Sequence, residues 1–293
     1  MTRRDTLLAL LVVLLWGVNF VVIDAGLADV PPLLLLTLRF TVVALPAVFF
    51  IRKPDAPWRV IVGVGLFMSL GQFALLYLAL HLGMPAGLAS LVLQTQIVFT
   101  VVIAAVVLRE RPSRRQVLGL GIGVAGLAVV MLAHGVVAPW LPLLVTVAAA
   151  LSWAIGNVIG RGAKGASGLS LVVWSALVVP IPAFALALVV DGPPTIFAAL
   201  GTLSPAAILS TLYTVVFASF VSYGIWNSLL AKHPAAQVVP FALLIPVVGV
   251  LAAWLFQGEV PTVLELVGGA VMVIGLAVAT VRRVSAPRLA QTR

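Results

Sequence analysis

Two matched pairs of aromatic and amide residues offer the chemistry of binding a small zwitterion. Asn19 follows Trp16 by three residues, and Asn157 follows Trp153 by four. On a helix, such spacings place both members of a pair on one face. Amides can hydrogen-bond the polar groups of a substrate, while indole rings contact its apolar part. The same asparagines could bond neighbouring helices instead, so a cavity role and a packing role both remain open.

Other polar and aromatic side chains also fall inside apolar stretches, where unpaired polar groups are costly. Gln94 and Gln96 are two residues apart and cannot share a helix face. We therefore expect one of them to face a central cavity and the other to bond a neighbour. Packing is again the alternative for the further cavity candidates, which are Gln72, Tyr77, Tyr223 and Asn227.

Arg39 is the one basic residue within an apolar stretch. A guanidinium suits a substrate carboxylate because it can donate paired hydrogen bonds to it. The structural alternative is a buried ion pair with Asp24 or Asp29, or a side chain that extends outward to the membrane surface.

No Asp or Glu lies near the middle of an apolar stretch. Proton- and sodium-coupled carriers commonly bury a carboxylate, so the sequence favours facilitated diffusion or exchange unless His81 or a backbone site substitutes. The chain has no cysteine, its three histidines are scattered, and it has no phosphate-binding loop of the Walker A type. We expect no catalytic residue, no metal site and no cofactor, and we do not expect an enzyme.

The apolar stretches themselves define the class of protein. The 293 residues are 63% hydrophobic and only 9% charged, whereas soluble domains carry about 25% charged residues. Each stretch has about 18 to 25 residues, enough to cross about 30 Å of hydrocarbon at about 1.5 Å per residue. The ten predicted membrane helices cover residues 7–23, 33–51, 60–81, 86–108, 116–133, 139–160, 169–189, 206–230, 235–256 and 264–281.

The distribution of positive charge predicts the orientation. With the N-terminus in the cytoplasm, every Lys and Arg except Arg39 falls in a cytoplasmic connection or terminus. Positive residues resist translocation, so both termini are expected inside and the chain is expected to be a multi-pass protein of the inner (plasma) membrane. The net charge of +9 does not indicate a nucleic-acid partner, because the charges are spread over short membrane-flanking loops.

An internal repeat accompanies this pattern. A shift of 149 residues aligns Glu110 with Glu259. Without a gap, it also aligns the Leu-Ala-Val triplet at 127–129 with the same triplet at 276–278. The sequence thus predicts two five-helix units, residues 1–137 and 138–293. Five is odd, so the second unit enters the membrane inverted, an arrangement that in secondary transporters places the substrate site between the units. For Glu110, a salt bridge or a helix cap is expected rather than a role in transport.

Three segments carry a resemblance to a known family. They are residues 16–20 (WGVNF), 38–40 (LRF) and 85–90 (PAGLAS). In these segments the chain resembles the drug/metabolite transporter superfamily, in its EamA-type branch of ten-helix exporters. The resemblance covers essentially the whole chain, and it is greatest for exporters of amino acids and their relatives.

The resemblance implies an all-α integral membrane protein that exports amino acids and related small metabolites by alternating access through a central cavity. The expected partners are that small-molecule substrate and membrane lipids, and a monomer should suffice. Export of lipophilic drugs and proton-coupled antiport are the alternatives, and a membrane-embedded enzyme is disfavoured.

Overall fold

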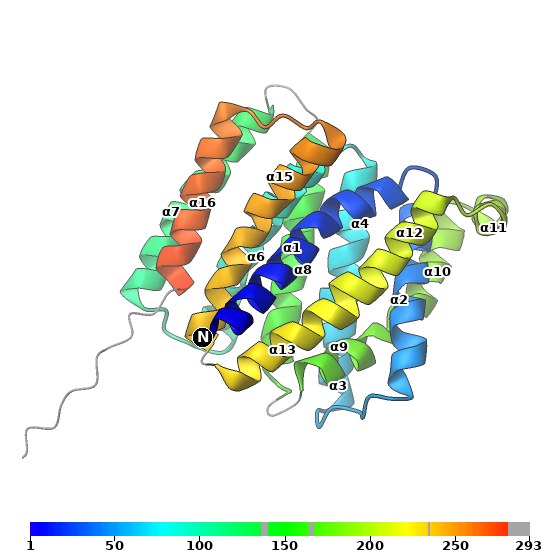
Figure 1. The fold of residues 1–293 in the computed structure, drawn as a ribbon, viewed down its shortest axis with the longest axis horizontal. Coiled ribbons are helices and arrows are strands. Elements are labelled where there is room, and N and C mark those ends of the chain that lie inside the picture. Colours follow the sequence, from blue (N-terminus) through cyan, green and yellow to red (C-terminus); the bar gives the residue numbers. More distant parts are fainter. Residues whose placement is uncertain (136–139, 164–166, 234, 281–293) are drawn as a thin grey trace, which may run out of the picture.

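The fold, seen in a computed structural model, is a bundle of helices (Figure 1). The structure describes residues 1–135, 140–163, 167–233 and 235–280. No strand occurs among these residues. The all-α prediction is therefore confirmed for the described part of the chain.

The helices recur along the whole described chain and are often divided into shorter segments. In the first part of the chain they are α1 (Arg3–Gly26), α2 (Pro32–Val48), α3 (Trp58–Val64), α4 (Gln72–His81), α5 (Ala86–Val92), α6 (Gln96–Val107) and α7 (Arg114–Gly135). In the second part they are α8 (Trp140–Gly160), α9 (Gly168–Ala176), α10 (Pro180–Val190), α11 (Pro193–Gly201), α12 (Pro205–Tyr213), α13 (Ser222–Lys232), α14 (Ala235–Val238), α15 (Ile245–Gln257) and α16 (Val263–Thr280).

Four irregular helical segments join some of these helices into longer spans. Wider π-helical turns form η1 (Gly65–Gly71), between α3 and α4, and η3 (Thr214–Val221), between α12 and α13. Tighter 3₁₀ turns form η2 (Leu93–Thr95) and η4 (Val239–Leu244). Such segments often mark functional positions in a helix.

Six helical stretches are long and apolar enough to cross a bilayer, as an integral membrane protein requires. They are Arg3–Gly26, Trp58–His81, Ala86–Val107, Trp140–Gly160, Gly168–Val190 and Pro205–Leu229. The count of ten crossings and the cytoplasmic placement of both termini stay predictions, and residues 281–293 lie outside the described part. The short helix α11 was not predicted.

The packing is organised around α1 and α8. In Figure 1, α1 (dark blue) lies between α15 and the α12–α13 helix, and it packs against all three. Similarly, α8 packs against α4 and α6. Helices α7 and α16 form a pair at one side of the bundle (Figure 1).

Glycines permit the close approach of α7 and α16. A Cβ on Gly126 would lie 2.6 Å from the Met272 nitrogen and 2.7 Å from the Gly268 oxygen. Small residues bring helices together in lipid, where there is no hydrophobic force between them.

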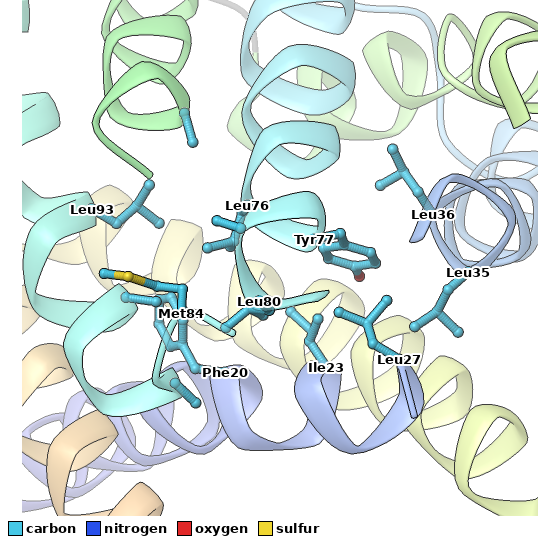
Figure 2. Packing of buried hydrophobic residues seen from close by; sticks show 14 of the residues in the cluster. Phe20, Ile23, Leu27, Leu35, Leu36, Leu76, Tyr77, Leu80, Met84 and Leu93 are labelled. Carbon is cyan, nitrogen blue, oxygen red and sulfur yellow. The ribbon is translucent and has the colours of Figure 1, made fainter. Parts of the chain in front are cut away.

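The buried core lies mainly at one end of the bundle. Figure 2 shows it where α1 ends, α2 begins and α4 leads into α5, with Ile23, Leu36 and Leu76 among its members. The cluster at the opposite end contains only Ala9, Leu229 and Val238 among the described buried residues. The large connected cluster therefore lies at one end, although Val60, Ile61 and Val64 of α3 are also buried at the other.

Candidate functional site

A buried arginine lies between α2 and α4. Arg39 is 4% exposed, and its Nη1 donates a hydrogen bond to the Tyr77 hydroxyl at 3.2 Å. Its guanidinium carbon lies 4.2 Å from the centre of the Phe73 ring, within the range of a cation–π contact. Tyr77 extends from α4 toward α1 and α2 among Leu27, Leu35 and Leu36 (Figure 2). We call Arg39, Phe73 and Tyr77 the arginine cage.

An aromatic cluster joins the first helix to α13. The ring of Trp16 lies 5.3 Å from that of Tyr223 and 5.4 Å from that of Trp226, measured between ring centroids. The Trp16 indole N–H donates to the Ala218 carbonyl at 2.9 Å, which fixes the ring's orientation. Trp16 thus brings the rings of Tyr223 and Trp226 together between α1 and α13.

A pair of amides connects α6 and α8. The Asn157 Nδ2 donates to Gln96 Oε1 at 2.8 Å and approaches Thr100 Oγ1 at 3.3 Å. Gln96 is the first residue of α6, directly after the 3₁₀ turn of η2. This turn changes the direction in which the following side chains point. Of the two predicted glutamines, Gln96 is thus the one that bonds a neighbour, and the placement of either one in a cavity stays a prediction.

Several buried polar atoms near these groups have no hydrogen-bond partner among the described residues. They are Asn19 Oδ1, Arg39 Nε, Thr95 Oγ1, Trp153 Nε1 and Asn227 Nδ2. Burying a polar group without a partner costs free energy. Water or a ligand would remove that cost, so these atoms can serve as binding groups.

The remaining predicted residues are placed without such direct links. Gln72 and Gln94 are buried, and in the described part of the chain neither side chain forms a hydrogen bond that joins it to the three groups above. Asn227 packs against the start of α9, where a Cβ on Gly168 would lie 2.5 Å from its Oδ1. The structure therefore brings together Trp16 with Tyr223, Arg39 with Tyr77 and Gln96 with Asn157.

Four residues of this region were not predicted from the sequence. Phe73 precedes Tyr77 by four residues, and Thr100 follows Gln96 by four, so a search for neighbours at helical spacing would have found both. Trp226 falls three residues after Tyr223. Thr95 carried no signal, because a threonine in an apolar helix commonly bonds its own backbone.

The acids at the helix ends have structural partners. Glu259 accepts hydrogen bonds from the backbone nitrogens of Ala86 at 3.0 Å and Gly87 at 3.1 Å, and so caps the start of α5. Glu110 forms an ion pair with Arg161. The predicted salt bridge or cap for Glu110 is therefore confirmed as a salt bridge.

The chemistry of the region is that of binding. It offers one cation, several amides and hydroxyls, and a set of aromatic rings. Within the described ranges, no group of three or more His, Asp or Glu gathers that could hold a metal ion. An arginine with a free donor, next to aromatic faces, is suited to a molecule with a carboxylate and an apolar part.

Comparisons with known proteins agree on one family. The profile of the EamA-like transporter family matches residues 5–132 and again residues 140–281. The chain is 43% identical over 282 residues to the "Probable amino-acid metabolite efflux pump" of Escherichia coli (strain K12), covering 94% of each sequence. It is equally similar, at 43% over 282 residues and 94% of each sequence, to the protein of the same name in Salmonella typhimurium.

A solved structure, named only "Crystal structure of protein", shares the fold. It superposes with a TM-score of 0.63 at 23% identity. The match covers 98% of this chain and 100% of that one. At this identity, the likeness concerns the fold alone.

Proposed function

The chain belongs to the EamA-like transporter family, and we propose that it exports amino acids and related small metabolites by alternating access. It is a multi-pass membrane protein of a family of transporters, and close relatives are named as efflux pumps. The substrate class, the route and the mechanism are the proposal. The names of those relatives and the chemistry of the arginine cage and the aromatic cluster support it.

Arg39 is buried and has no ion-pair partner among the described residues, and this observation carries the substrate assignment. Asp24 is bonded by the Gln257 amide, Asp29 is exposed, and neither forms an ion pair with Arg39. An arginine that is 4% exposed in a membrane bundle without a counter-charge is costly. A substrate carboxylate supplies that charge, and the free Arg39 Nε supplies a donor for it.

The rest of an amino acid matches the surroundings of Arg39. Its side chain would lie against Trp16, Tyr223 and Trp226, whose large faces accept many apolar shapes. Its ammonium group needs acceptors, and Asn19 Oδ1 is buried without a donor. We assign Gln72, Gln94 and Trp153 to the same cavity, and we assign Gln96 and Asn157 to its wall because they bond each other.

We further propose that the chain consists of two inverted five-helix halves with ten crossings and cytoplasmic termini. The family profile matches twice, which supports a duplication. The irregular turns recur as well: the π-helical turns begin at Gly65 and Thr214, 149 residues apart, the same shift that aligns Glu110 with Glu259. A duplicated unit explains why such local features return at one spacing.

Alternating access requires a state open to one side, and the position of the large buried cluster supports an inward-open state here. In the proposed orientation the dense core lies at the outer end. There Glu259 ties α15 to α5, and a Cβ on Gly87 would lie 3.1 Å from Ala253 Cβ. At the inner end, α6 and α14 are not among the helix pairs that pack extensively in the described part of the chain.

The test is uptake of a panel of labelled amino acids into liposomes that contain only this protein, with and without a pH gradient. Several neutral amino acids should equilibrate without a gradient, because no carboxylate lies near the middle of a span to carry a proton. Accumulation only with a gradient would contradict facilitated transport. No uptake of any amino acid would contradict the substrate class.

A further inference from the structure

A groove outside the proposed transport path runs between α15 and α16. It has a volume of about 660 Å³, within the about 300–1,000 Å³ typical of small-molecule sites. Its floor is formed by α5 at Leu88 and Leu91. No member of the arginine cage, the aromatic cluster or the amide pair lines it. The groove is therefore a separate candidate site.

The groove opens sideways into the region that the bilayer fills. Its walls include Leu251, Leu266 and Ile274, which are 51%, 51% and 56% exposed on the protein surface. From Glu265 to Ile274 on α16, nine residues advance about 14 Å at about 1.5 Å per residue. This is close to half of the about 30 Å hydrocarbon thickness, so the groove spans about one leaflet.

Two carboxylates mark the polar end of the groove. Glu259 and Glu265 both line it, and no Lys or Arg does. Both Glu259 oxygens accept backbone hydrogen bonds of α5. Glu265 Oε2 accepts from Thr262, whereas no hydrogen bond to its Oε1 occurs among the described residues. A free carboxylate oxygen thus remains where an acyl groove meets the membrane surface.

We propose that this groove binds phosphatidylethanolamine, with an acyl chain along the apolar walls and the ammonium group at Glu265. An anionic headgroup is disfavoured by the two carboxylates. A choline headgroup is positive but has no N–H to donate, whereas an ammonium group can form a charge-assisted hydrogen bond. The lipid reaches the groove from the bilayer by lateral diffusion, because the opening faces hydrocarbon.

A lipid bound in this groove would also affect the closed outer end of the bundle, where α5 meets α15. The groove is lined by Gly87 of α5 and Ala253 of α15, the two residues whose close approach accompanies the Glu259 cap. A lipid in the groove therefore contacts both helices of the closed outer end. We expect it to stabilise the state with α5 and α15 together.

The experiment measures lipid retained by the full-length protein. The protein is placed in bilayers with equal amounts of phosphatidylethanolamine, phosphatidylcholine and phosphatidylglycerol of identical acyl chains, then extracted and weighed by native mass spectrometry. Phosphatidylethanolamine should be enriched about tenfold over the other two, as expected for one charge-assisted hydrogen bond. Glu265→Gln should abolish the headgroup preference, and Ala270→Leu should abolish retention by filling the groove, which Ala270 lines.

The control is Val267→Leu, on the same helix but outside the groove lining and 50% exposed. It should retain phosphatidylethanolamine as the unaltered protein does. Equal retention of all three lipids, or retention unchanged by Glu265→Gln and Ala270→Leu, would overturn the proposal. A dimer that carries no lipid and dissociates in the Ala270→Leu variant would also overturn the proposal. Retention of a long-chain alkylamine without any phospholipid would do the same.

Discussion

Asn157 of α8 donates a hydrogen bond to Gln96 of α6 at 2.8 Å. The two residues lie 61 positions apart in sequence and belong to different predicted halves of the chain. Thr100, one turn along α6, stands within 3.3 Å of the same amide nitrogen. The contact therefore joins the halves through side chains within the spans, where water cannot easily substitute for a lost partner.

Replacing either amide should destabilise the protein by a similar small amount. Asn157→Leu or Gln96→Leu should each lower stability by about 0.6 kcal/mol, the average for side-chain hydrogen bonds in a membrane protein. The double variant should be little worse than either single one, because both remove the same interaction. Thermal unfolding of the three variants in one detergent measures this coupling. Strictly additive losses would show that the two amides act independently.

Arg39 should be required for efficient transport of molecules that carry a carboxylate. Arg39→Gln removes the charge, and Arg39→Lys keeps it but loses the planar fork that matches a carboxylate. Both should reduce amino-acid uptake by about tenfold or more, the effect of at least about 1.4 kcal/mol in binding, and chiefly by raising KM. Initial uptake rates over a range of concentrations test this, with protein amount and thermal stability as controls. An unchanged KM in Arg39→Gln would refute the carboxylate role.

The Tyr77→Phe variant separates the effect of positioning Arg39 from the effect of its charge. It removes the hydroxyl that accepts from Arg39 while keeping the ring beside Phe73, 6.2 Å away between centroids. The arginine keeps its cation–π contact, so the rise in KM should be smaller than for Arg39→Gln, about threefold for a loss near about 0.6 kcal/mol. The measurement is the same uptake assay. An effect equal to that of Arg39→Gln would mean that the hydroxyl itself binds substrate.

The class of the fold could be predicted from the sequence because hydrophobic length is a strong signal. Predicted helix 139–160 corresponds to α8 (Trp140–Gly160), and 60–81 corresponds to Trp58–His81. The nine-residue α11 was missed, since a short surface helix has neither the length nor the hydropathy of a span. The π-helical turns also carried no recognisable local pattern.

The site was less predictable because contacts depend on how helices rotate against one another. Helical spacing could pair Trp16 with Asn19, yet the structure pairs Trp16 with Tyr223, about 200 residues away along the chain. The sequence could show that Arg39 was buried and costly. It could not show that aromatic rings, rather than Asp24 or Asp29, would surround it, because that depends on the packing of α2 against α4.

Gly126 should be essential to the α7–α16 pair. Gly126→Leu would place a side chain within 3 Å of the α16 backbone, and overpacking of this kind costs about 1–3 kcal/mol. Thermal unfolding should therefore occur at a clearly lower temperature. Gly121→Leu is the matched control on the same helix, since a Cβ at Gly121 meets nothing within 4 Å. Equal destabilisation by both variants would mean that the close approach at Gly126 is not the cause of the effect, since Leu favours a helix more than Gly does.

Glu259 should hold the outer end closed, and the absence of cysteine from the chain makes this measurable. Ser90 is fully buried in α5, where a Cβ on Gly249 would collide with it. A Ser90→Cys protein should react slowly with a membrane-impermeant thiol reagent. Adding Glu259→Ala removes both acceptors of the α5 nitrogens, and losing even about 1.4 kcal/mol should raise the labelling rate about tenfold.

Glu265→Ala in the same Ser90→Cys protein is the control for the higher labelling rate expected with Glu259→Ala. Its carboxylate bonds Thr262 within its own connection and not α5, so in bilayers without phosphatidylethanolamine labelling at position 90 should stay slow. Faster labelling only with Glu259→Ala locates the closure at the α5 cap, because the two variants remove the same charge from the same end of the bundle. If both variants accelerate labelling equally, general loss of negative charge at the surface opens the structure, and the cap is not the closing element.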